Sequence, residues 1–128
     1  MREILFRGKR SNGEWAYGNL QTAADCAFIS EFMGYCNAVD PETVGQYIGP
    51  DKNGEKIFEG DIGRYKQTDG AKRNGKPITC IGKVVYNAKT ASFAVESKDE
   101  AGCKYFDYFP IKDFEVVGNI HDNPELLD

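Results

Sequence analysis

The sequence predicts a mainly β protein whose later part forms a small β-barrel, with few short helical turns. Short segments of strand-forming residues recur at close spacing, and turns rich in Gly, Asn and Pro separate them. No segment has the apolar stripe of a three-turn helix. The 128 residues are 41% hydrophobic and 12% aromatic. That is about one domain, with a core that requires no disulfide or metal.

The first part of the chain, residues 1–56, is predicted to form a hairpin and extended segments that pack on the barrel. Two strand-like segments, residues 4–7 and 15–20, flank Asn12-Gly13, which can take the positive φ angles of a tight reversal. A third strand is expected at residues 27–32.

One turn at residues 40–43 and one turn-rich stretch at residues 49–54 end this first part. Residues 40–43 (DPET) are predicted to form a turn or a single helical turn, with Asp40 as the cap and Pro41 in the first helical position. Residues 44–48 are then expected to be extended. The stretch 49–54 (GPDKNG) is dense in turn-forming residues and is predicted to separate the first part of the chain from the later strands.

The barrel is predicted over residues 57–120. Its strands are expected at residues 62–66, 79–86, 91–96, 104–109 and 114–120. Closure would remove the exposed sheet edges that invite aggregation. The tail, residues 121–128, combines a cap-like Asn123-Pro124 with Leu126-Leu127, so it is expected to end in one amphipathic turn.

Charge is distributed unevenly along the chain. Residues 62–89 contain seven cations and one acid, Asp69, a net +6, so the remainder carries −10 to give −4 overall. Clustered cations can bind nucleic acid by displacing counterions from phosphates. They can equally hold subunits together, if the basic loop of one copy meets an acidic face of the next. The third interpretation is a solvated loop and strand edge, where lysines block unwanted pairing.

Aromatic residues lie on both faces of one predicted strand, in the sequence YFDYF at residues 105–109. Phe106 and Phe109 are expected in the core, unless the alternate set faces inward. Aromatic residues on the surface, such as Tyr105 or Tyr108, could instead stack on a base or bind a proline-rich peptide.

The sequence gives no support for catalysis or a cofactor. Its four cysteines form no C-x-x-C pair and are expected to stay reduced, and no metal site is expected. No phosphate-binding loop, H-E-x-x-H or G-x-S-x-G occurs. His121-Asp122 is the only histidine with a neighbouring acid, and it precedes a capped turn, where a surface role is more natural.

Four stretches in the same order resemble the YopX family of phage and prophage proteins. They are MREILFRG (residues 1–8), VDPETVGQYIG (39–49), DKNGEKIFEGDI (51–62) and VGNIHDNPELL (117–127). The resemblance implies an all-β chain whose later part is an SH3-like barrel, a phage or prophage origin, and assembly into a homo-oligomer. The family has no established activity, so it supplies no functional residues.

These observations together predict a non-enzymatic, oligomeric binding or assembly module. Its partners would be copies of itself and a host or phage protein. Without an export-type start or a long apolar run, we expect it in the cytoplasm and away from membranes. The alternative is a nucleic-acid-binding accessory protein that uses the basic segment, and an enzyme of unknown class is third. Candidate contacts to nucleic acid or subunits are Arg64, Lys66, Lys72, Arg73, Lys76, Lys83, Tyr105 and Tyr108.

Overall fold

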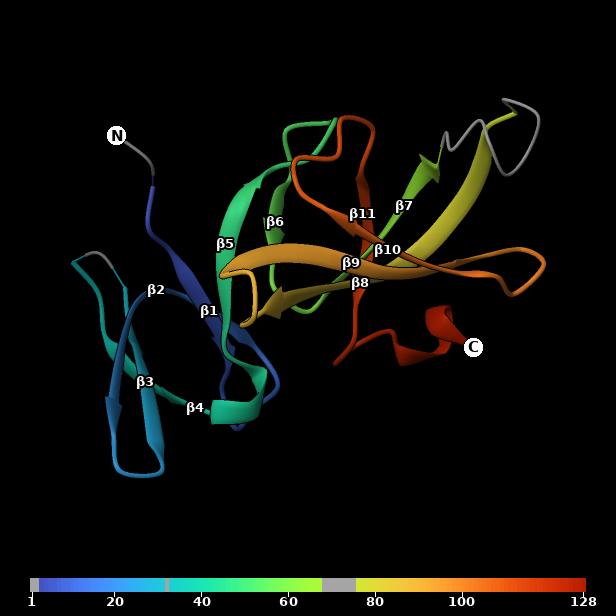
Figure 1. Ribbon diagram of the computed structural model, residues 1–128. Helices are drawn as coiled ribbons and strands as arrows, with labels where there is room; N and C mark the ends of the chain where they lie inside the picture. The colour runs from blue at the N-terminus through green and yellow to red at the C-terminus, as the bar shows by residue number, and fades with distance from the viewer. Residues whose placement is uncertain (1–2, 32, 68–75) are drawn as a thin grey trace. The chain divides into compact units, whose positions relative to one another are not determined.

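The protein is mainly β, as the sequence predicts, and a computed structural model describes residues 3–31, 33–67 and 76–128. The described residues form strands β1 to β11 and two short 3₁₀ helices, η1 and η2 (Figure 1). The chain divides into two compact units, Met1–Ile48 and Gly49–Asp128. The predicted division at residue 56 stays a prediction.

The first unit is built on an antiparallel sheet. Its elements are β1 (Phe6–Lys9), β2 (Trp15–Ala23), β3 (Cys26–Ser30), β4 (Cys36–Val39), η1 (Pro41–Thr43) and β5 (Gly45–Pro50). The strand order is β4-β3-β2-β1-β5-β6, and β5 crosses the boundary between the units. Its core consists of Ala16, Ala27, Ile29 and Val39. The predicted hairpin is present, with Gly13 at φ 87° in its turn.

The single turn predicted after residue 39 is η1. The Asp40 carboxylate accepts a hydrogen bond from the Glu42 amide at 3.0 Å, and Pro41 opens the turn. Thr43 is buried and attaches this turn to β1, because its hydroxyl accepts from the Lys9 amide at 2.8 Å. The same hydroxyl donates to the Asp40 carbonyl at 2.7 Å.

The second unit contains a separate five-stranded antiparallel sheet, in the order β10-β9-β8-β7-β11. The elements are β6 (Lys56–Phe58), β7 (Asp61–Gln67), β8 (Ile78–Asn87), β9 (Ser92–Asp99), β10 (Lys104–Tyr108), β11 (Glu115–Asn119) and η2 (Pro124–Leu127). The final turn predicted at Leu126-Leu127 is therefore confirmed as η2.

The aromatic part of the core of the second unit lies on one face of this sheet. Phe114 is fully buried and packs directly over Gly63, where any Cβ would lie 1.9 Å from the ring. The ring also contacts Phe109 and Tyr65, with centroid distances of 5.2 Å and 6.2 Å. The opposite face is covered in part near Gly118, where Leu126 of η2 approaches.

The backbone hydrogen bonds do not close the predicted barrel. In the strand order of the described residues, β10 and β11 are the two edges of an open sheet. Side chains make the connection between β7 and β10 instead, because Tyr65 and Gln67 both donate to Asp107. The spacing of strands in the sequence does not decide whether the edges of a sheet join through backbone or through side chains.

Candidate interaction surface

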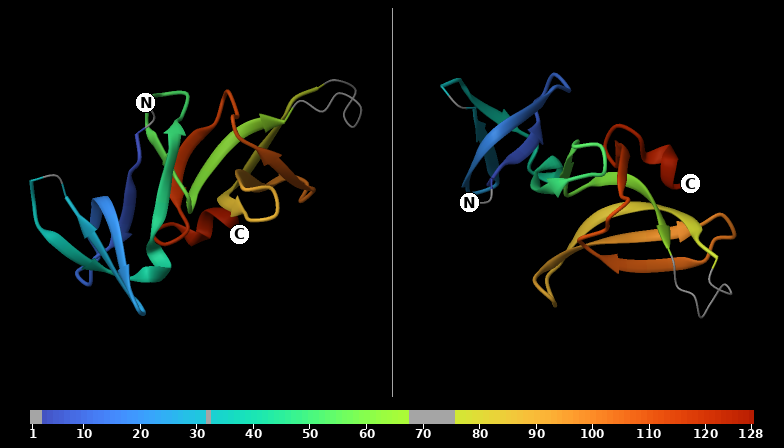
Figure 2. Two further views of the ribbon diagram at one scale, coloured as in Figure 1. Left: turned by 60° about the vertical axis from the view of Figure 1, so that its left-hand side comes forward. Right: turned by 90° about the horizontal axis from the view of Figure 1, so that it is seen from above.

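Strand β10 forms one margin of the second sheet, as the right-hand view of Figure 2 shows. Its pairing with β9 is regular over all five residues, from Lys104 opposite Lys98 to Tyr108 opposite Ala94. The alternation of a strand places Lys104, Phe106 and Tyr108 on one face. Tyr105 lies on the other face, which carries the core.

Two aromatic side chains stand exposed on the outer face of β10. Phe106 is 43% exposed and Tyr108 is 45% exposed. Their rings stack edge to face, with centroids 5.2 Å apart and an interplanar angle of 83°. The prediction that Phe106 belongs to the core is therefore wrong, and the alternate set faces inward. Phe109 is half-buried against Phe114, as expected.

A hydrogen-bonded network holds the inner face of β10 in place. The Tyr65 hydroxyl donates to the Asp107 carboxylate, so it accepts from the Ser97 hydroxyl at 2.7 Å. Gln67 donates to the second Asp107 oxygen at 2.7 Å. Burial, and then the hydrogen bond to Asp107, raises the pKa of the Tyr65 phenol well above its ordinary value. The phenol therefore stays neutral and acts as a structural donor rather than a base.

The two predicted tyrosines have different environments. Tyr105 is half-buried, and its hydroxyl donates to the Asp99 carboxylate at 3.0 Å, which commits its ring to the inner face. Tyr108 is exposed, and its hydroxyl accepts from the Asn87 amide at 3.1 Å. Of these two tyrosines, Tyr108 is the one whose ring is exposed.

Two predicted cations pair with carboxylates of the same chain. Arg64 Nη2 lies 2.7 Å from Glu115, and Lys83 Nζ lies 3.8 Å from Glu96. The hydrogen bond from Arg64, and then the charge of Lys52, lowers the pKa of the Glu115 carboxyl. This pairing offsets part of the positive charge predicted for the segment 62–89.

The other predicted cations divide into two groups. Lys66 and Lys76 are exposed, and the Lys66 amide donates to Asp113 at 2.9 Å. Lys72 and Arg73 lie outside the described residues. The registers of the strands place Arg64, Lys66 and Lys83 on one face of the second sheet. Tyr105 lies on the other face.

A groove of about 670 Å³ adjoins the end of β10. Tyr65, Gln67 and Asp107 contribute to its lining, together with Tyr108. The remaining lining residues are Lys52, Lys66, Pro77, Pro110, Ile111, Lys112 and Asp113. Sequence reasoning missed this groove, because its members come from five separate stretches of chain.

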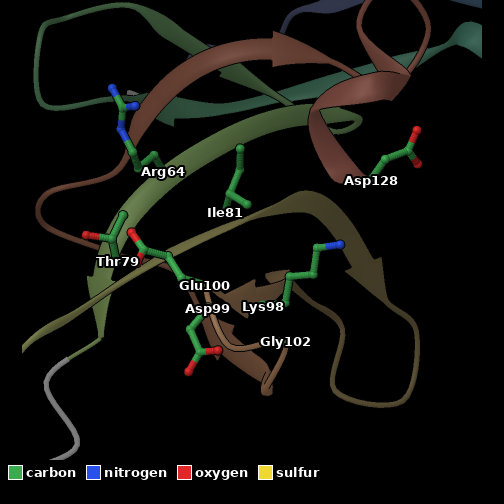
Figure 3. A pocket seen from close by; sticks show the side chains of 8 residues that line it. All are labelled: Arg64, Thr79, Ile81, Lys98, Asp99, Glu100, Gly102 and Asp128. Atoms are coloured by element: carbon green, nitrogen blue, oxygen red, sulfur yellow. The ribbon is translucent and has the colours of Figure 1, made fainter.

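A second pocket, of about 390 Å³, lies over β7, β8 and β9 (Figure 3). It mixes the cations Arg64 and Lys98 with the acids Glu100 and Asp128, and Ile81 lies between Arg64 and Asp128 in the view shown. Charges of both signs at the same site favour neither a polyanion nor a bare cation. Within the described residues, no group of three or more metal-ligating side chains is present.

His121 and the cysteines show no catalytic grouping among the residues that the structure describes. His121 is half-buried in a turn where its amide donates to the Asn119 side chain at 3.0 Å. Cys80 is buried and the other three cysteines are exposed, all of them as thiols.

The fold and surface define a mainly β protein of two antiparallel sheets with an exposed aromatic edge. A family model described as YopX protein matches residues 5–128. The chain therefore belongs to the YopX family. No curated protein and no solved structure matches it. In the described part of the chain, no helix is long and apolar enough to cross a membrane.

Proposed function

We propose that this protein is a non-enzymatic binding or assembly module that acts as a homo-oligomer. The observation that carries the proposal is the exposed aromatic pair Phe106–Tyr108 on an edge strand. Proteins usually blunt or cover such edges, since exposed strands and aromatic rings promote association. A second copy of the chain would cover both features at once.

The charge layout favours assembly over nucleic-acid binding. Two of the predicted cations, Arg64 and Lys83, are paired within the chain, and the whole chain carries −4. A polyanion would have to compete with Glu115 and Glu96 for those cations. Assembly through the edge strand needs no such exchange.

Nucleic-acid binding is the second candidate function, and one observation favours it. Lys66 and Tyr108 line the same groove. Lys76 is exposed and directly precedes Pro77, another residue that lines this groove. Such a groove could combine phosphate contacts with base stacking. An enzyme of unknown class is the third candidate, resting only on His121 and scattered carboxylates.

Family membership supports several finer proposals. They are an origin in a phage or prophage, action in the host cytoplasm, and contact with a host or phage protein besides the self-contact. The order β10-β9-β8-β7-β11, with a single long antiparallel meander from β7 to β10, supports an SH3-like arrangement that is incompletely closed.

Sedimentation velocity of the full chain over a wide concentration range tests the assembly proposal. We expect the average mass to rise with concentration above that of one 14.3 kDa chain. A single monomeric species at every concentration would rule the proposal out.

A titration with short DNA and RNA fragments at low salt tests the second candidate. Binding that is lost in a Lys72→Ala/Arg73→Ala/Lys76→Ala variant, and lost steeply as salt rises, would favour nucleic acid. No binding at low ionic strength would exclude it.

A further inference from the structure

We infer that β10 pairs with β10 of a second copy, antiparallel and in a register centred on Phe106. This inference rests on the proposed assembly function and names the surface that would perform it.

The backbone of β10 alternates between groups bonded to β9 and groups directed away from it. The Phe109 amide donates to the Phe93 carbonyl at 3.2 Å, which fixes the phase of the alternation. In an antiparallel ladder, bonded and non-bonded pairs alternate. The residues bonded to β9 are then Tyr105 and Asp107, so the amides and carbonyls of Lys104, Phe106 and Tyr108 point outward from the sheet.

Two other margin strands, β11 and β4, are less suited to this pairing. Strand β11 has an irregular register between Val116 and Gly118, and the Asn123 side chain accepts from the Asn119 amide at 3.3 Å. Bulges and covering side chains are the usual means of blocking an edge. The margin strand β4 presents the small or polar residues Cys36, Asn37 and Ala38. Strand β10 is regular and carries the exposed aromatic pair.

The side chains of β10 complement themselves under a two-fold axis through Phe106. Phe106 then faces Phe106 of the second copy, and Lys104 faces Tyr108 on both sides. These contacts are an aromatic pair and two cation–π contacts, with no like charges opposed. An axis through Lys104 would instead place two ammonium groups opposite each other. The centred register also gives about six backbone hydrogen bonds between the copies.

Hydrogen bonds on the inner face of β10 hold the strand extended before any pairing. Tyr105 is bonded to Asp99, and Asp107 is bonded to Tyr65 and Gln67, so the strand is already fixed in extended form. A preformed strand loses little conformational freedom on pairing. The contact is nevertheless small, since it uses one five-residue strand from each copy. We therefore expect a dimer with a dissociation constant on the order of micromolar rather than an obligate one.

Two variants of the full-length chain, compared by sedimentation, test the surface. Phe106→Lys should raise the dissociation constant by more than about tenfold, because each dimer loses its central aromatic pair and gains opposed charges. Tyr35→Lys is the matched control: Tyr35 is 83% exposed and lies outside β10. It should leave the dissociation constant unchanged. Thermal unfolding of both variants verifies that they fold.

A charge exchange tests the register. Tyr108→Lys would place this lysine opposite Lys104 of the second copy, so it should weaken the dimer by about tenfold. Adding Lys104→Glu to that variant creates two ion pairs across the axis and should restore most of the lost affinity. Failure of the double variant to recover would overturn the centred register.

Hydrogen exchange gives an independent readout on the unmodified protein. The amides of Phe106 and Tyr108 should exchange fast in dilute solution and slowly in concentrated solution, while the Tyr105 amide should not change. Suppose that Phe106→Lys leaves the dissociation constant of the oligomer unchanged and that these amides exchange at the same rate at all concentrations. This result would overturn the inference about β10, but it would not contradict the assembly proposal. A wild-type chain that is always monomeric would overturn the assembly proposal itself.

Discussion

Asp51 shows how one buried carboxylate can connect two distant parts of the second unit. It accepts hydrogen bonds from the amides of Asn53 at 2.8 Å, Glu55 at 2.9 Å and Val116 at 3.0 Å. Burial alone would raise its pKa, but the three amides, together with the charge of Lys52, outweigh that effect and hold the pKa below its ordinary value. The carboxylate form is thus the one that stabilises the turn at 51–55 against β11.

Replacing this carboxylate should destabilise the protein in a pH-dependent way. Asp51→Asn directs N–H donors at backbone amides, so we expect a loss of about 1–3 kcal/mol in the free energy of unfolding at pH near 7. A lowered pKa means that the Asp51 contribution is present above the unfolded value of about 3.9 and is lost as pH falls through the folded one. Urea titrations at neutral pH and near pH 3 should therefore show the difference between wild type and variant shrinking in acid. An unchanged difference would contradict this account.

Gly63 is required by the ring that covers it. A Cβ at this position would lie 1.9 Å from Cζ of Phe114, a fully buried ring packed against Phe109 and Tyr65. Because the ring cannot shift freely, Gly63→Ala should cost about 1–3 kcal/mol of stability, measured by thermal or urea unfolding. Adding Phe114→Leu to Gly63→Ala should cost less than the sum of the two single changes, since the smaller side chain relieves the overlap. Strictly additive costs would show that the clash is not the cause.

The orientation of β10 could not be predicted from the residues of the strand itself. The segment YFDYF at residues 105–109 carries aromatic residues on both faces, so hydrophobicity cannot choose between them. The choice depends on partners distant in sequence: Asp99 for the Tyr105 hydroxyl, and Tyr65 for Asp107. Phe106 is left outside because the inner face is filled by a polar network rather than by rings alone.

The link between strands β7 and β10 depends on the Tyr65 hydroxyl. Tyr65→Phe removes a donor to Asp107 and an acceptor for Ser97, so we expect a loss of about 1–2 kcal/mol of unfolding free energy at neutral pH. Tyr35→Phe, at an 83% exposed position, should have no measurable effect.

The pH dependence of the Tyr65→Phe loss has a definite direction. Since the folded phenol pKa is raised, its contribution is fully present below the unfolded value of about 10 and is lost as pH rises toward the folded value. Denaturant titrations above pH 10 should show the variant and wild type converging. In absorbance titrations, one phenol should ionise only after the exposed tyrosines. Ionisation of all seven tyrosines together would contradict the buried network.

Alternation and turn chemistry predicted most elements, for a physical reason. In β2 and β8 the more buried positions alternate with less buried ones, and each predicted turn contains Gly, Asn or Pro, as at Gly13 and Asp40-Pro41. Strands β4 and β6 were missed because they have only four and three residues, too few to show a period. In β9, Ala94 and Val95 lie on opposite faces of the strand, and both are fully buried.

For the whole molecule, the sequence predicted the charge of the basic segment but not its neutralisation. Glu115 and Glu96 are distant from Arg64 and Lys83 along the chain, and only the pairing of β7 with β11 and of β8 with β9 brings them together. A linear count of charge therefore overstated the positive potential of residues 62–89. Family membership, in contrast, was readable from motifs spread along the chain, and it covers residues 5–128.

Salt should distinguish the two ways in which copies of this chain could associate. A dimer held by backbone hydrogen bonds and aromatic contacts between two chains of charge −4 should strengthen slightly as salt screens their repulsion. An assembly in which the basic loop of one copy meets an acidic face of the next should weaken steeply instead. Sedimentation at one fixed concentration, from about 0.05 M to about 0.5 M NaCl, measures the sign of this dependence. Dissociation at high salt would indicate that the basic segment, and not β10, forms the interface.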